Sequence, residues 1–320
     1  MASVGSATAV VATAFGGPEV LSLTEVEVGP PAQRQVLVEV RAAGVNPVDY
    51  KLYSAGRAGD TSKLPMRLGL EAAGVVKAVG EGAEGPAGPV GVGAEVIAYP
   101  VQGAYATEIV APASSVLPKP AALSFEQAGG LMLTGVTAFH AVTAVKVSKG
   151  DTVVVHGAAG GVGLMAVQLA IDLGARVIGT AGESGHTCVR QMGAEPVTYG
   201  EGLVERIRAL APGGIDAAID TVGTDEAVDA SLALVSDRAR IASIAAFRRA
   251  PGLGIKLLGN GPGADPGTEL RSAARLELLR LVDEDKLRVV VAAIYPLSEA
   301  ASAHATLAAG HTHGKIILVP

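Results

Sequence analysis

The sequence predicts an α/β protein with two domains, one rich in β-strands and one built on a doubly wound parallel sheet. Its length of 320 residues fits two domains of roughly 150 residues each. The first 120 residues hold alternating apolar runs between glycine and proline clusters, and strand patterns then alternate with helical ones. The tail holds strand patterns again, so we expect it to complete the first domain. The predicted domains are residues 1–125 with 287–320, and residues 126–286.

The β-rich prediction for the first domain depends on short alternating runs. They are Val36–Val40, Gly74–Val79 and Glu95–Tyr99, and turn-forming clusters such as Gly29-Pro30-Pro31 and the stretch 82–93 separate them. The pattern is typical of a small barrel-like or rolled domain. It ends near Ser124, which together with Gln127 fits the capping box of a helix start.

From Ser124 onward, strands alternate with helices. The predicted strands are Asp151–Val155, Arg176–Thr180, Ala217–Asp220 and Arg240–Ala245, and the predicted helices are Val162–Leu173, Gly185–Met192 and Thr224–Val235. Units of this length predict a parallel sheet with helices on both faces. The remaining elements are a glycine- and proline-rich loop over Pro251–Gly267, a helix over Thr268–Asp283, strands at Val289–Ile294 and Lys315–Val319, and a short helix capped at Ser298.

Composition and charge exclude several classes of protein. Hydrophobic residues make up 49% of the chain and charged residues 18%, which excludes a disordered chain. A net charge of −6 and an aromatic content of 3% argue against a nucleic-acid partner. The single cysteine, Cys188, excludes a disulfide framework. The first basic residue is Arg34, so the basic start of a secretory signal is missing and we expect a cytoplasmic protein.

One apolar stretch, Val153–Ile171, has the length of a membrane span. Glycines inside it divide a β-branched run from a run with helical periodicity. We therefore interpret the stretch as a buried strand followed by a buried helix, and we expect no association with a membrane.

The most informative motif lies within this stretch. It reads Val153-Val154-Val155-His156-Gly157-Ala158-Ala159-Gly160-Gly161-Val162-Gly163, a buried strand that runs into glycines and then directly into a helix. Dinucleotide binding needs this arrangement, because a tight turn and a bare backbone let the pyrophosphate approach the N–H groups of a helix N-terminus. In the G-x-G-x-x-G frame, Ala158 replaces the first glycine. The predicted cofactor contacts here are Ala158, Ala159, Gly160, Gly161 and Val162.

The residue after the second strand bears on the choice of cofactor. An NAD site usually carries Asp or Glu there to hold the ribose 2′-hydroxyl group, and this chain has Ala181. The uncharged side chain leaves room for a 2′-phosphate, for which the candidate donors are Ser184, His186, Arg190 and Tyr199. Glu183 favours NAD, and Ser184 and His186 could equally be a helix cap and a solvated helix residue. We expect NADPH (NADP+) as the cofactor.

These motifs resemble the medium-chain dehydrogenase/reductase superfamily, and within it the zinc-independent quinone oxidoreductase and enone reductase branch. The resemblance covers essentially the whole chain. Its motifs are Gly16–Leu21, Gly44–Lys51, Gly69–Gly74, the glycine loop, Asp220–Gly223 and Gly314–Val319. It implies a GroES-like β-rich catalytic domain and a Rossmann cofactor domain. It also implies a homodimer paired through a sheet edge of the cofactor domain, for which Arg240–Ala245 is the candidate.

The resemblance argues against zinc. Zinc-dependent relatives carry a cysteine where this chain has Asn46 and a histidine where it has Leu70, and they often have a lobe of four cysteines. A catalytic zinc ion needs about three protein ligands. His311 and His313 form a pair without a third partner in the sequence, so we interpret them as part of a solvated loop and expect no metal.

Without a metal, the protein must stabilise the negative charge that hydride transfer leaves on a carbonyl oxygen. The resemblance places Asn46 near the nicotinamide or the substrate, where its amide could donate a hydrogen bond. Tyr50, Lys51 and Tyr53 are the nearest candidate proton donors, although Lys51 could be a solvated charge, the tyrosines could be packing residues and water could serve as the acid.

Two carboxylates near these residues, Asp49 and Glu71, are expected to fix turns or pair with Arg67 rather than act as a catalytic pair. Further cofactor contacts follow from the resemblance. These are Asn46, Thr134, Val222, Ala245, Ala246 and Phe247.

The sequence therefore predicts an NADPH-dependent reductase that transfers hydride to a quinone or an α,β-unsaturated carbonyl compound. One alternative is a zinc-free alcohol or ketone oxidoreductase, which would turn over saturated ketones or secondary alcohols. Another is an NADPH-binding protein without turnover. The intact glycine loop, Asn46 and Lys51 favour an enzyme.

Overall fold

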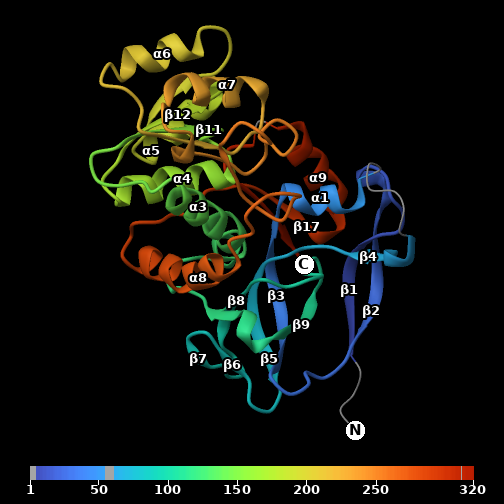
Figure 1. Ribbon diagram of the computed structural model, residues 1–320. Coiled ribbons are helices and arrows are strands. Elements are labelled where there is room, and N and C mark those ends of the chain that lie inside the picture. The colour runs from blue at the N-terminus through green and yellow to red at the C-terminus, as the bar shows by residue number, and fades with distance from the viewer. Residues whose placement is uncertain (1–4, 55–60, 311) are drawn as a thin grey trace. The chain divides into compact units, whose positions relative to one another are not determined.

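The computed structural model describes residues 5–54, 61–310 and 312–320 (Figure 1). By the contacts among its residues the chain divides into two compact units, Met1–Leu133 with Val291–Pro320, and Thr134–Val290. We call these the first unit and the second unit. The predicted α/β class is confirmed. The domain limits predicted at residues 125 and 287 stay a prediction.

The first unit is dominated by antiparallel strands. One sheet has the order β2-β1-β4, and a larger one has the order β10-β8-β5-β3-β18-β17 with β9 also paired to β3. The bounds are β1 Gly5–Ala12, β2 Leu21–Val28, β3 Gln35–Val45, β4 Met66–Arg67, β5 Ala72–Val79, β6 Glu84–Gly85, β7 Gly88–Pro89, β8 Glu95–Ala98, β9 Glu108–Pro112, β10 Val116–Pro118, β17 Val291–Pro296 and β18 Lys315–Val319.

Strand β3 connects the beginning of the chain with its end. Residues 35–40 alternate between half-buried and buried, and the buried valines face the core of the unit. Strand β18 pairs antiparallel with β3 and places Ile316 opposite Val45. The pairing therefore brings Lys315, at the start of β18, beside the end of β3.

The helices of the first unit are α1 Pro47–Tyr53, α2 Phe125–Gly129 and α9 Ala300–Ala309. The capping box predicted at Ser124 and Gln127 is present at the start of α2. At the start of α1 the Asp49 carboxylate accepts a hydrogen bond from the N–H group of Asn46, the N-cap residue, and Pro47 supplies a helical φ. The cap predicted at Ser298 is wrong, because Ser298 lies inside a short 3-10 turn, Leu297–Glu299, and α9 begins after it.

The second unit contains a six-stranded parallel sheet with the order β13-β12-β11-β14-β15-β16. The strands are β11 Thr152–His156, β12 Arg176–Ala181, β13 Glu195–Thr198, β14 Ala217–Asp220, β15 Ile241–Ser243 and β16 Lys256–Leu257. The helices are α3 Met132–Ala144, which begins in the first unit, α4 Gly161–Asp172, α5 His186–Gln191, α6 Leu203–Leu210, α7 Asp225–Leu234 and α8 Thr268–Asp283. Figure 1 shows α6 and α7 on one side of this sheet and α4 and α8 on the other.

Two sequence predictions fail at the end of this sheet. The stretch 251–267, predicted as a loop, contains strand β16. Because β16 pairs with β15, the strand within residues 240–245 is an interior strand, and its prediction as the sheet edge is wrong. The edge on this side is β16, a strand of two residues.

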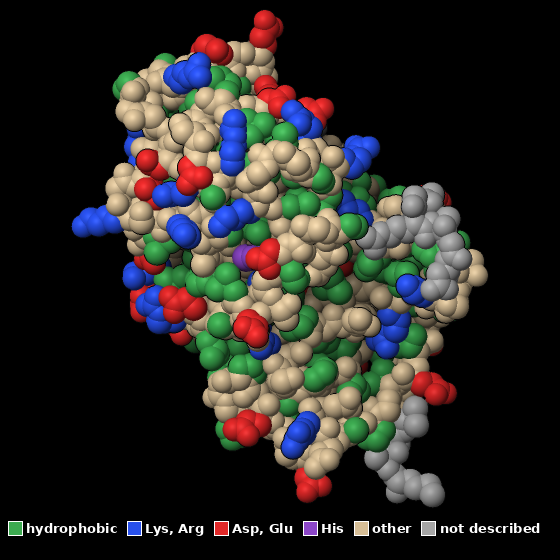
Figure 2. Space-filling model, in the orientation of Figure 1, with side chains coloured by type: hydrophobic (Ala, Val, Ile, Leu, Met, Phe, Trp, Pro, Cys, Tyr) green, Lys and Arg blue, Asp and Glu red, His purple; other side chains and the backbone are tan. Residues whose placement is uncertain are grey.

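The apolar stretch 153–171 lies in strand β11 and helix α4, with the glycine loop between them. Across residues 5–54, 61–310 and 312–320, no helix has the length and apolar character of a membrane span. On the face shown in Figure 2, acidic and basic side chains are interspersed rather than gathered by sign.

Candidate active site

The predicted phosphate loop lies between β11 and α4. Gly157 has a φ of 73°, a left-handed conformation that glycine adopts without strain. A Cβ atom on Gly163 would lie 2.1 Å from the carbonyl oxygen of Gly157, so only glycine fits there. A Cβ atom on Gly160 would come no closer than 3.4 Å to any such neighbour. The inner side of the loop is therefore tightly packed, and its outer side is open.

Helix α4 begins directly at the open side of this loop. Its N-cap, Gly160, has no side chain to cap the helix, so the first N–H groups are available to an acceptor. Ala158 and Ala159 are buried, while Gly161 and Val162 are half-buried. The positive end of the helix dipole favours an anion at this point. The loop therefore fits the pyrophosphate of a dinucleotide.

The residues predicted to select the cofactor lie at the ends of β12 and β13. Ala181 ends β12 opposite Thr198, whose hydroxyl oxygen lies 3.3 Å from Nε2 of His186. Tyr199 is 51% exposed, and its hydroxyl oxygen would lie 3.5 Å from a Cβ atom on Gly182. Ser184 lies in the short turn before α5. Ala181 itself is buried and carries no charge, whereas Glu183, the acid that favours NAD, is exposed in the same short turn as Ser184.

Two buried polar residues join the loops that follow β14 and β15. Oδ1 of Asp220 accepts hydrogen bonds from the N–H groups of Val222 and Gly223, both at 2.9 Å. Oδ2 of Asp220 accepts from the Ser243 hydroxyl group at 2.6 Å.

Ser243 in turn fixes the loop that was predicted to meet the nicotinamide. Its oxygen accepts from the N–H groups of Ala245 at 3.1 Å and Ala246 at 2.9 Å. The Phe247 ring packs so closely on Gly261 that a Cβ atom there would lie 2.3 Å from it. Asp220 and Ser243 therefore hold the backbone near Val222 and Ala245 in place. The role of Ser243 is not predictable from its local sequence, although the Asp220–Gly223 motif points to the site.

His156 lies at the end of β11, directly before the loop. Burial lowers the pKa of His156 to about 4, against the opposing effect of Asp220, so the ring is neutral at pH 7. Nδ1 lies 3.4 Å from the Thr180 hydroxyl oxygen, and Nε2 has no hydrogen-bond partner among the described residues. The base of the loop therefore carries no positive charge from this histidine.

A second group of polar side chains is buried in the first unit around Asn46. Nδ2 of Asn46 donates to Oε1 of Glu71 at 3.0 Å, and Oδ1 accepts from Nζ of Lys315 at 2.6 Å. Glu71 and Lys315 are themselves in contact, 3.0 Å apart. Oε2 of Glu71 accepts from the N–H group of Leu133, at the start of α3. Three motifs noted in the sequence, 44–51, 69–74 and 314–319, thus meet in one cluster.

A row of hydrogen bonds extends from this cluster. Oδ2 of Asp49 accepts from the N–H group of Asn46 at 2.9 Å and from the Tyr105 hydroxyl group at 2.8 Å. The Tyr105 oxygen lies 3.2 Å from Nε2 of His304, and Nδ1 of His304 lies 2.7 Å from the Tyr53 oxygen.

Burial sets the protonation of this row. It raises the pKa of Asp49 to about 7, against the hydrogen bonds from Tyr105 and Asn46 that lower it. It lowers the pKa of His304 to about 4, which keeps the ring neutral. Burial also raises the pKa of Tyr53 and of Tyr105 above the ordinary value of a phenol. All three aromatic side chains are therefore uncharged at pH 7.

The predicted catalytic residues occupy different environments. Asn46 and Tyr53 are each 1% exposed and belong to the buried network, whereas Tyr50 is half-buried and Lys51 is exposed on α1. Asp49 fixes a turn, as expected. Glu71 pairs with Lys315, so its predicted pairing with Arg67 is wrong.

Lys315, Tyr105 and His304 contact the predicted site residues in the structure and are absent from the residues predicted from the sequence. Of these three residues, only Lys315 lies in a motif noted in the sequence, the one at 314–319. Nothing in the local sequence marks the other two as neighbours of α1, because strand pairing and packing bring them together.

The donor set at Asn46 does not fit zinc. Where zinc-dependent relatives have a cysteine, this chain has an amide that accepts a hydrogen bond from an ammonium group. Within the described ranges, no three His, Cys, Asp or Glu side chains are arranged to hold a metal ion. His311 lies outside the described residues, so its pairing with His313 is not tested. The absence of a metal stays a prediction.

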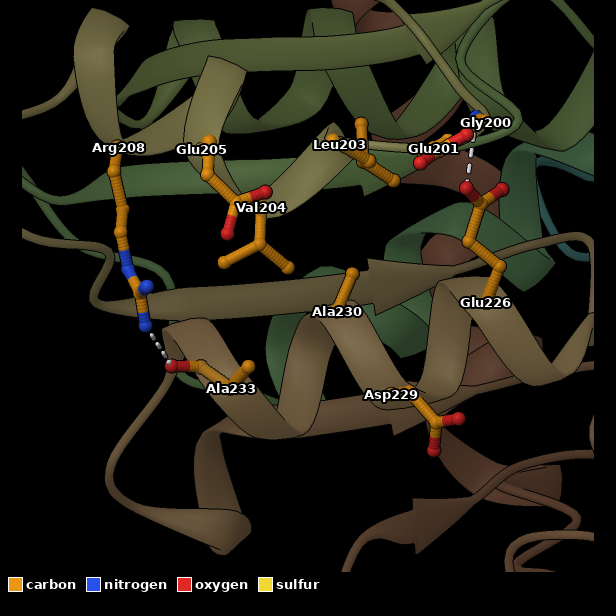
Figure 3. Close-up of a pocket in the computed structure, with 11 residues that line it drawn as sticks. Gly200, Glu201, Leu203, Val204, Glu205, Arg208, Glu226, Asp229, Ala230 and Ala233 are labelled. Atoms are coloured by element: carbon orange, nitrogen blue, oxygen red, sulfur yellow. Dashed lines mark hydrogen bonds between the residues drawn. The ribbon is translucent and has the colours of Figure 1, made fainter.

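A surface hollow of about 450 Å³ lies between α6 and α7 of the second unit (Figure 3). Gly200 is one of the residues that line the hollow, and its N–H group donates to Oε1 of Glu226 at 2.7 Å. Its side chains include four carboxylates and one guanidinium group, from Arg208. This acidic lining suits a phosphate group less well than the glycine loop does.

Comparison with known proteins agrees with these features. Residues 32–121 match the model of the alcohol dehydrogenase GroES-like domain, and residues 192–318 match that of zinc-binding dehydrogenases. A quinone oxidoreductase of Salmonella typhimurium is 34% identical over 95% of this chain and 97% of its own length. Quinone oxidoreductase 1 of Escherichia coli is 32% identical over 95% and 97%.

Solved structures extend the comparison to the fold. Escherichia coli quinone oxidoreductase complexed with NADPH matches with a TM-score of 0.82 and 30% identity, over 98% of this chain and 100% of the other. An NAD-dependent alcohol dehydrogenase matches with a TM-score of 0.83 and 30% identity, over 98% and 99%. A GroES-like β-rich domain and a Rossmann sheet with a glycine loop define a two-domain dehydrogenase or reductase. The chain belongs to the medium-chain dehydrogenase/reductase superfamily, in its quinone oxidoreductase branch.

Proposed function

We propose that this protein is an NADPH-dependent, zinc-independent oxidoreductase that transfers hydride to a quinone. The glycine loop carries the proposal, since its inner side accepts only glycine at Gly163 and its outer side presents the N-terminus of α4. The uncharged Ala181 supports NADPH over NADH. The similarity to a quinone oxidoreductase complexed with NADPH supports both the cofactor and the substrate class.

Within this proposal, residues 158–162 would hold the pyrophosphate, and Ser184, His186 and Tyr199 would contact the 2′-phosphate. A second set of residues would contact the nicotinamide end. These are Asn46, Thr134, Val222, Ala245, Ala246 and Phe247. Asp220 and Ser243 support this set, because their hydrogen bonds fix the backbone on which Val222, Ala245 and Ala246 lie.

Bound NADPH supplies a hydride, and the protein must orient the acceptor and supply a proton. We extend the substrate class to α,β-unsaturated carbonyl compounds, because in both cases negative charge collects on a carbonyl oxygen. Tyr50 and Lys51 are the favoured proton donors, since they are the predicted candidates that reach solvent. Tyr53 stays a candidate, but its hydroxyl group contacts His304 in the core.

The test follows NADPH absorbance against quinones, enones, enals and saturated ketones. We expect oxidation with quinones and with enones or enals, and slower turnover when NADH replaces NADPH. Turnover of saturated ketones or secondary alcohols alone would support the second candidate, a zinc-free alcohol or ketone oxidoreductase, which the match to an alcohol dehydrogenase structure favours. Stoichiometric binding of NADPH without oxidation of any acceptor would indicate a non-catalytic nucleotide-binding protein.

We also propose a homodimer in the cytoplasm. Two-fold dimers are the commonest soluble oligomers, and the proposed contact lies on the second unit. It is not placed at an open sheet edge, because β15 is an interior strand and the N–H group of Asp265 donates to the carbonyl oxygen of Leu257 on the outer side of β16. Light scattering at micromolar concentration should report twice the mass of the chain, and a monomer would refute the dimer.

A further inference from the structure

Lys315, the first residue of β18, is buried with 3% of its surface exposed. An ammonium group has three N–H donors and no acceptor. Its Nζ atom lies 2.6 Å from Oδ1 of Asn46, 3.0 Å from Oε1 of Glu71 and 3.1 Å from the carbonyl oxygen of Val45. Each donor therefore has an acceptor inside the protein, and none remains for a ligand.

Glu71 neutralises this charge and is itself fully buried. The surrounding backbone makes room for the ion pair. A Cβ atom on Gly44 would lie 2.4 Å from Oε1 of Glu71, and one on Gly130 would lie 3.1 Å from Cε of Lys315. A buried ion pair contributes little net stability compared with a well-packed apolar pair. The role of this ion pair therefore lies in how it orients the neighbouring side chains.

The partners of Asn46 leave its carboxamide group one orientation. Its oxygen must face Lys315, which only donates, and its nitrogen must face the carboxylate of Glu71, which only accepts. The second N–H of the amide donates to the carbonyl oxygen of Gly44 at 3.2 Å. Turning the amide by 180° would bring donors against donors and acceptors against acceptors. Both N–H groups are thus used within the protein, and one lone pair of Oδ1 is left.

We propose that the Lys315–Glu71 ion pair is a positioning element that locks the Asn46 carboxamide, so that Asn46 meets a bound ligand as a hydrogen-bond acceptor. The part of this inference that concerns a bound ligand rests on the proposed function. It changes the role expected from the sequence, in which the Asn46 amide donates to a developing oxyanion. Lys315 and Glu71 act through Asn46, and they are positioning residues rather than catalytic ones.

The fixed orientation of the Asn46 amide can be tested by hydrogen exchange, without an activity assay. The chain contains only two asparagines, Asn46 and Asn260, so their side-chain signals are easily told apart. Labelling asparagine side chains with ¹⁵N gives two pairs of amide signals, and the variant Asn260→Asp assigns them. Asn260 is exposed and provides an internal reference for exchange with water. In the unliganded wild type, the amide hydrogens of Asn46 should exchange at least about a hundredfold more slowly than those of Asn260.

Two variants remove the lock. Lys315→Met removes the ammonium group, and Lys315→Met combined with Glu71→Gln removes both charges. The double variant is needed because removing one partner alone leaves an uncompensated buried charge, which can prevent folding. In either folded variant the amide hydrogens of Asn46 should exchange about tenfold faster or more, with those of Asn260 unchanged.

The matched control is the partly exposed pair formed by Lys77 and Glu39, whose charged atoms lie 3.4 Å apart. Lys77→Met with Glu39→Gln makes the same chemical change away from the cluster and should leave the exchange of Asn46 as in the wild type. Unchanged exchange in the Lys315 variants, or equal acceleration in the control, overturns the lock.

The effect on turnover is measured separately with NADPH and a quinone. If Lys315 acts through Asn46, the double variant and Asn46→Ala should each lower kcat by about tenfold, because the bound ligand is then less well positioned. Combining all three changes should then cost no more than Asn46→Ala alone, because they remove one shared interaction. Additive losses would overturn the positioning role. A wild type that oxidises no NADPH would refute the proposed function and leave the exchange result standing, so the two failures are distinguishable.

Discussion

The hydroxyl group of Tyr53 and Nδ1 of His304 lie 2.7 Å apart in the core of the first unit, although 251 positions separate the two residues. When Asp49 is ionised, its carboxylate can only accept hydrogen bonds. This fixes which group donates and which accepts at each step of the row from Asp49 to Tyr53. Tyr105 has one proton and gives it to Asp49, so Nε2 of His304 must donate to Tyr105. Nδ1 is then the acceptor, and it receives the proton of Tyr53.

This direction predicts that Tyr53→Phe affects the fold more than the chemistry. Without the hydroxyl group, Nδ1 of His304 becomes a buried acceptor without a partner, which costs about 1–3 kcal/mol. We expect urea unfolding to show this loss, while kcat at saturating NADPH changes less than threefold, on the order of 0.6 kcal/mol.

Lys51→Ala is the contrasting change, because Lys51 is exposed on α1 and its removal leaves no buried group unpaired. If Lys51 delivers the proton, kcat should fall, and the loss should vary with pH while stability is unchanged. A large fall in kcat for Tyr53→Phe together with wild-type rates for Lys51→Ala would reverse the two assignments.

The buried carboxyl group of Asp49 predicts a characteristic dependence of stability on pH. Burial raises its pKa from 3.8 to about 7, so between these values the folded protein holds a proton that the unfolded chain has released. Raising the pH through this interval therefore lowers the free energy of unfolding, by about 4 kcal/mol at roughly 1.4 kcal/mol per pH unit. Above pH 7 this contribution no longer changes.

The measurement is the difference in unfolding free energy between the wild type and Asp49→Asn from pH 4.5 to 8. The difference isolates Asp49, because His304 and the other groups titrate in both proteins. As the pH rises, the wild type should lose stability relative to Asp49→Asn. Asp283→Asn, an exposed change on α8, is the matched control for the substitution itself. A flat difference for Asp49→Asn would show that this carboxyl group titrates at its ordinary pKa.

Local patterns in the sequence predict several elements with the bounds that the structure has. Strand β14, helix α8 and strand β18 each combine a clear apolar period with turn-forming residues at their ends. Strand β16 escapes such prediction, because its two residues lie in a stretch rich in glycine and proline and are extended by pairing with β15. Local propensity carries little information where a neighbouring strand decides the conformation.

The same distinction holds for the candidate site. The glycine loop is predictable because its steric requirements lie within a few consecutive residues, as the contact between Gly163 and Gly157 shows. The contact between Lys315 and Asn46 is not, because 269 positions separate them and only the register of β18 on β3 brings them together. A motif search therefore finds the three segments of the cluster without showing that they meet.

Two glycines of the phosphate loop should respond differently to alanine. In Gly163→Ala the new methyl group would collide with the carbonyl oxygen of Gly157, so we expect a loss of about 1–3 kcal/mol or more in stability and at least about tenfold weaker binding of NADPH. Gly160→Ala has ordinary space within the protein and should fold normally. Its methyl group nevertheless occupies the open side of the loop, so binding of NADPH should weaken.

Thermal unfolding and calorimetric titration with NADPH separate these effects. Gly160→Ala serves as the folding control for Gly163→Ala. If both variants bind NADPH as the wild type does, the loop between β11 and α4 is not the phosphate site, and the proposed cofactor position is wrong.

The choice between NADPH and NADH is predicted to depend on position 181. Ala181→Asp places a negative charge at the end of β12, where it would repel a 2′-phosphate and accept a hydrogen bond from a 2′-hydroxyl group. The ratio of the two affinities should move toward NADH by at least about tenfold, or roughly 1.4 kcal/mol. Ala181→Ser is the matched control, since it adds a polar atom without charge and should leave the preference for NADPH intact.

His186 provides the second half of this test. Its Nε2 atom lies 3.3 Å from the hydroxyl oxygen of Thr198, so the ring is already held beside Ala181 before any ligand binds. If it contacts the 2′-phosphate, His186→Ala should weaken binding of NADPH by about tenfold and leave NADH unaffected, since a hydrogen bond to a charged group is worth about 1.5–3 kcal/mol. Calorimetry with both cofactors measures the two ratios. Equal affinities of the wild type for NADPH and NADH would refute the preference itself, whereas an unchanged ratio in His186→Ala would leave Ser184 and Tyr199 to hold the phosphate.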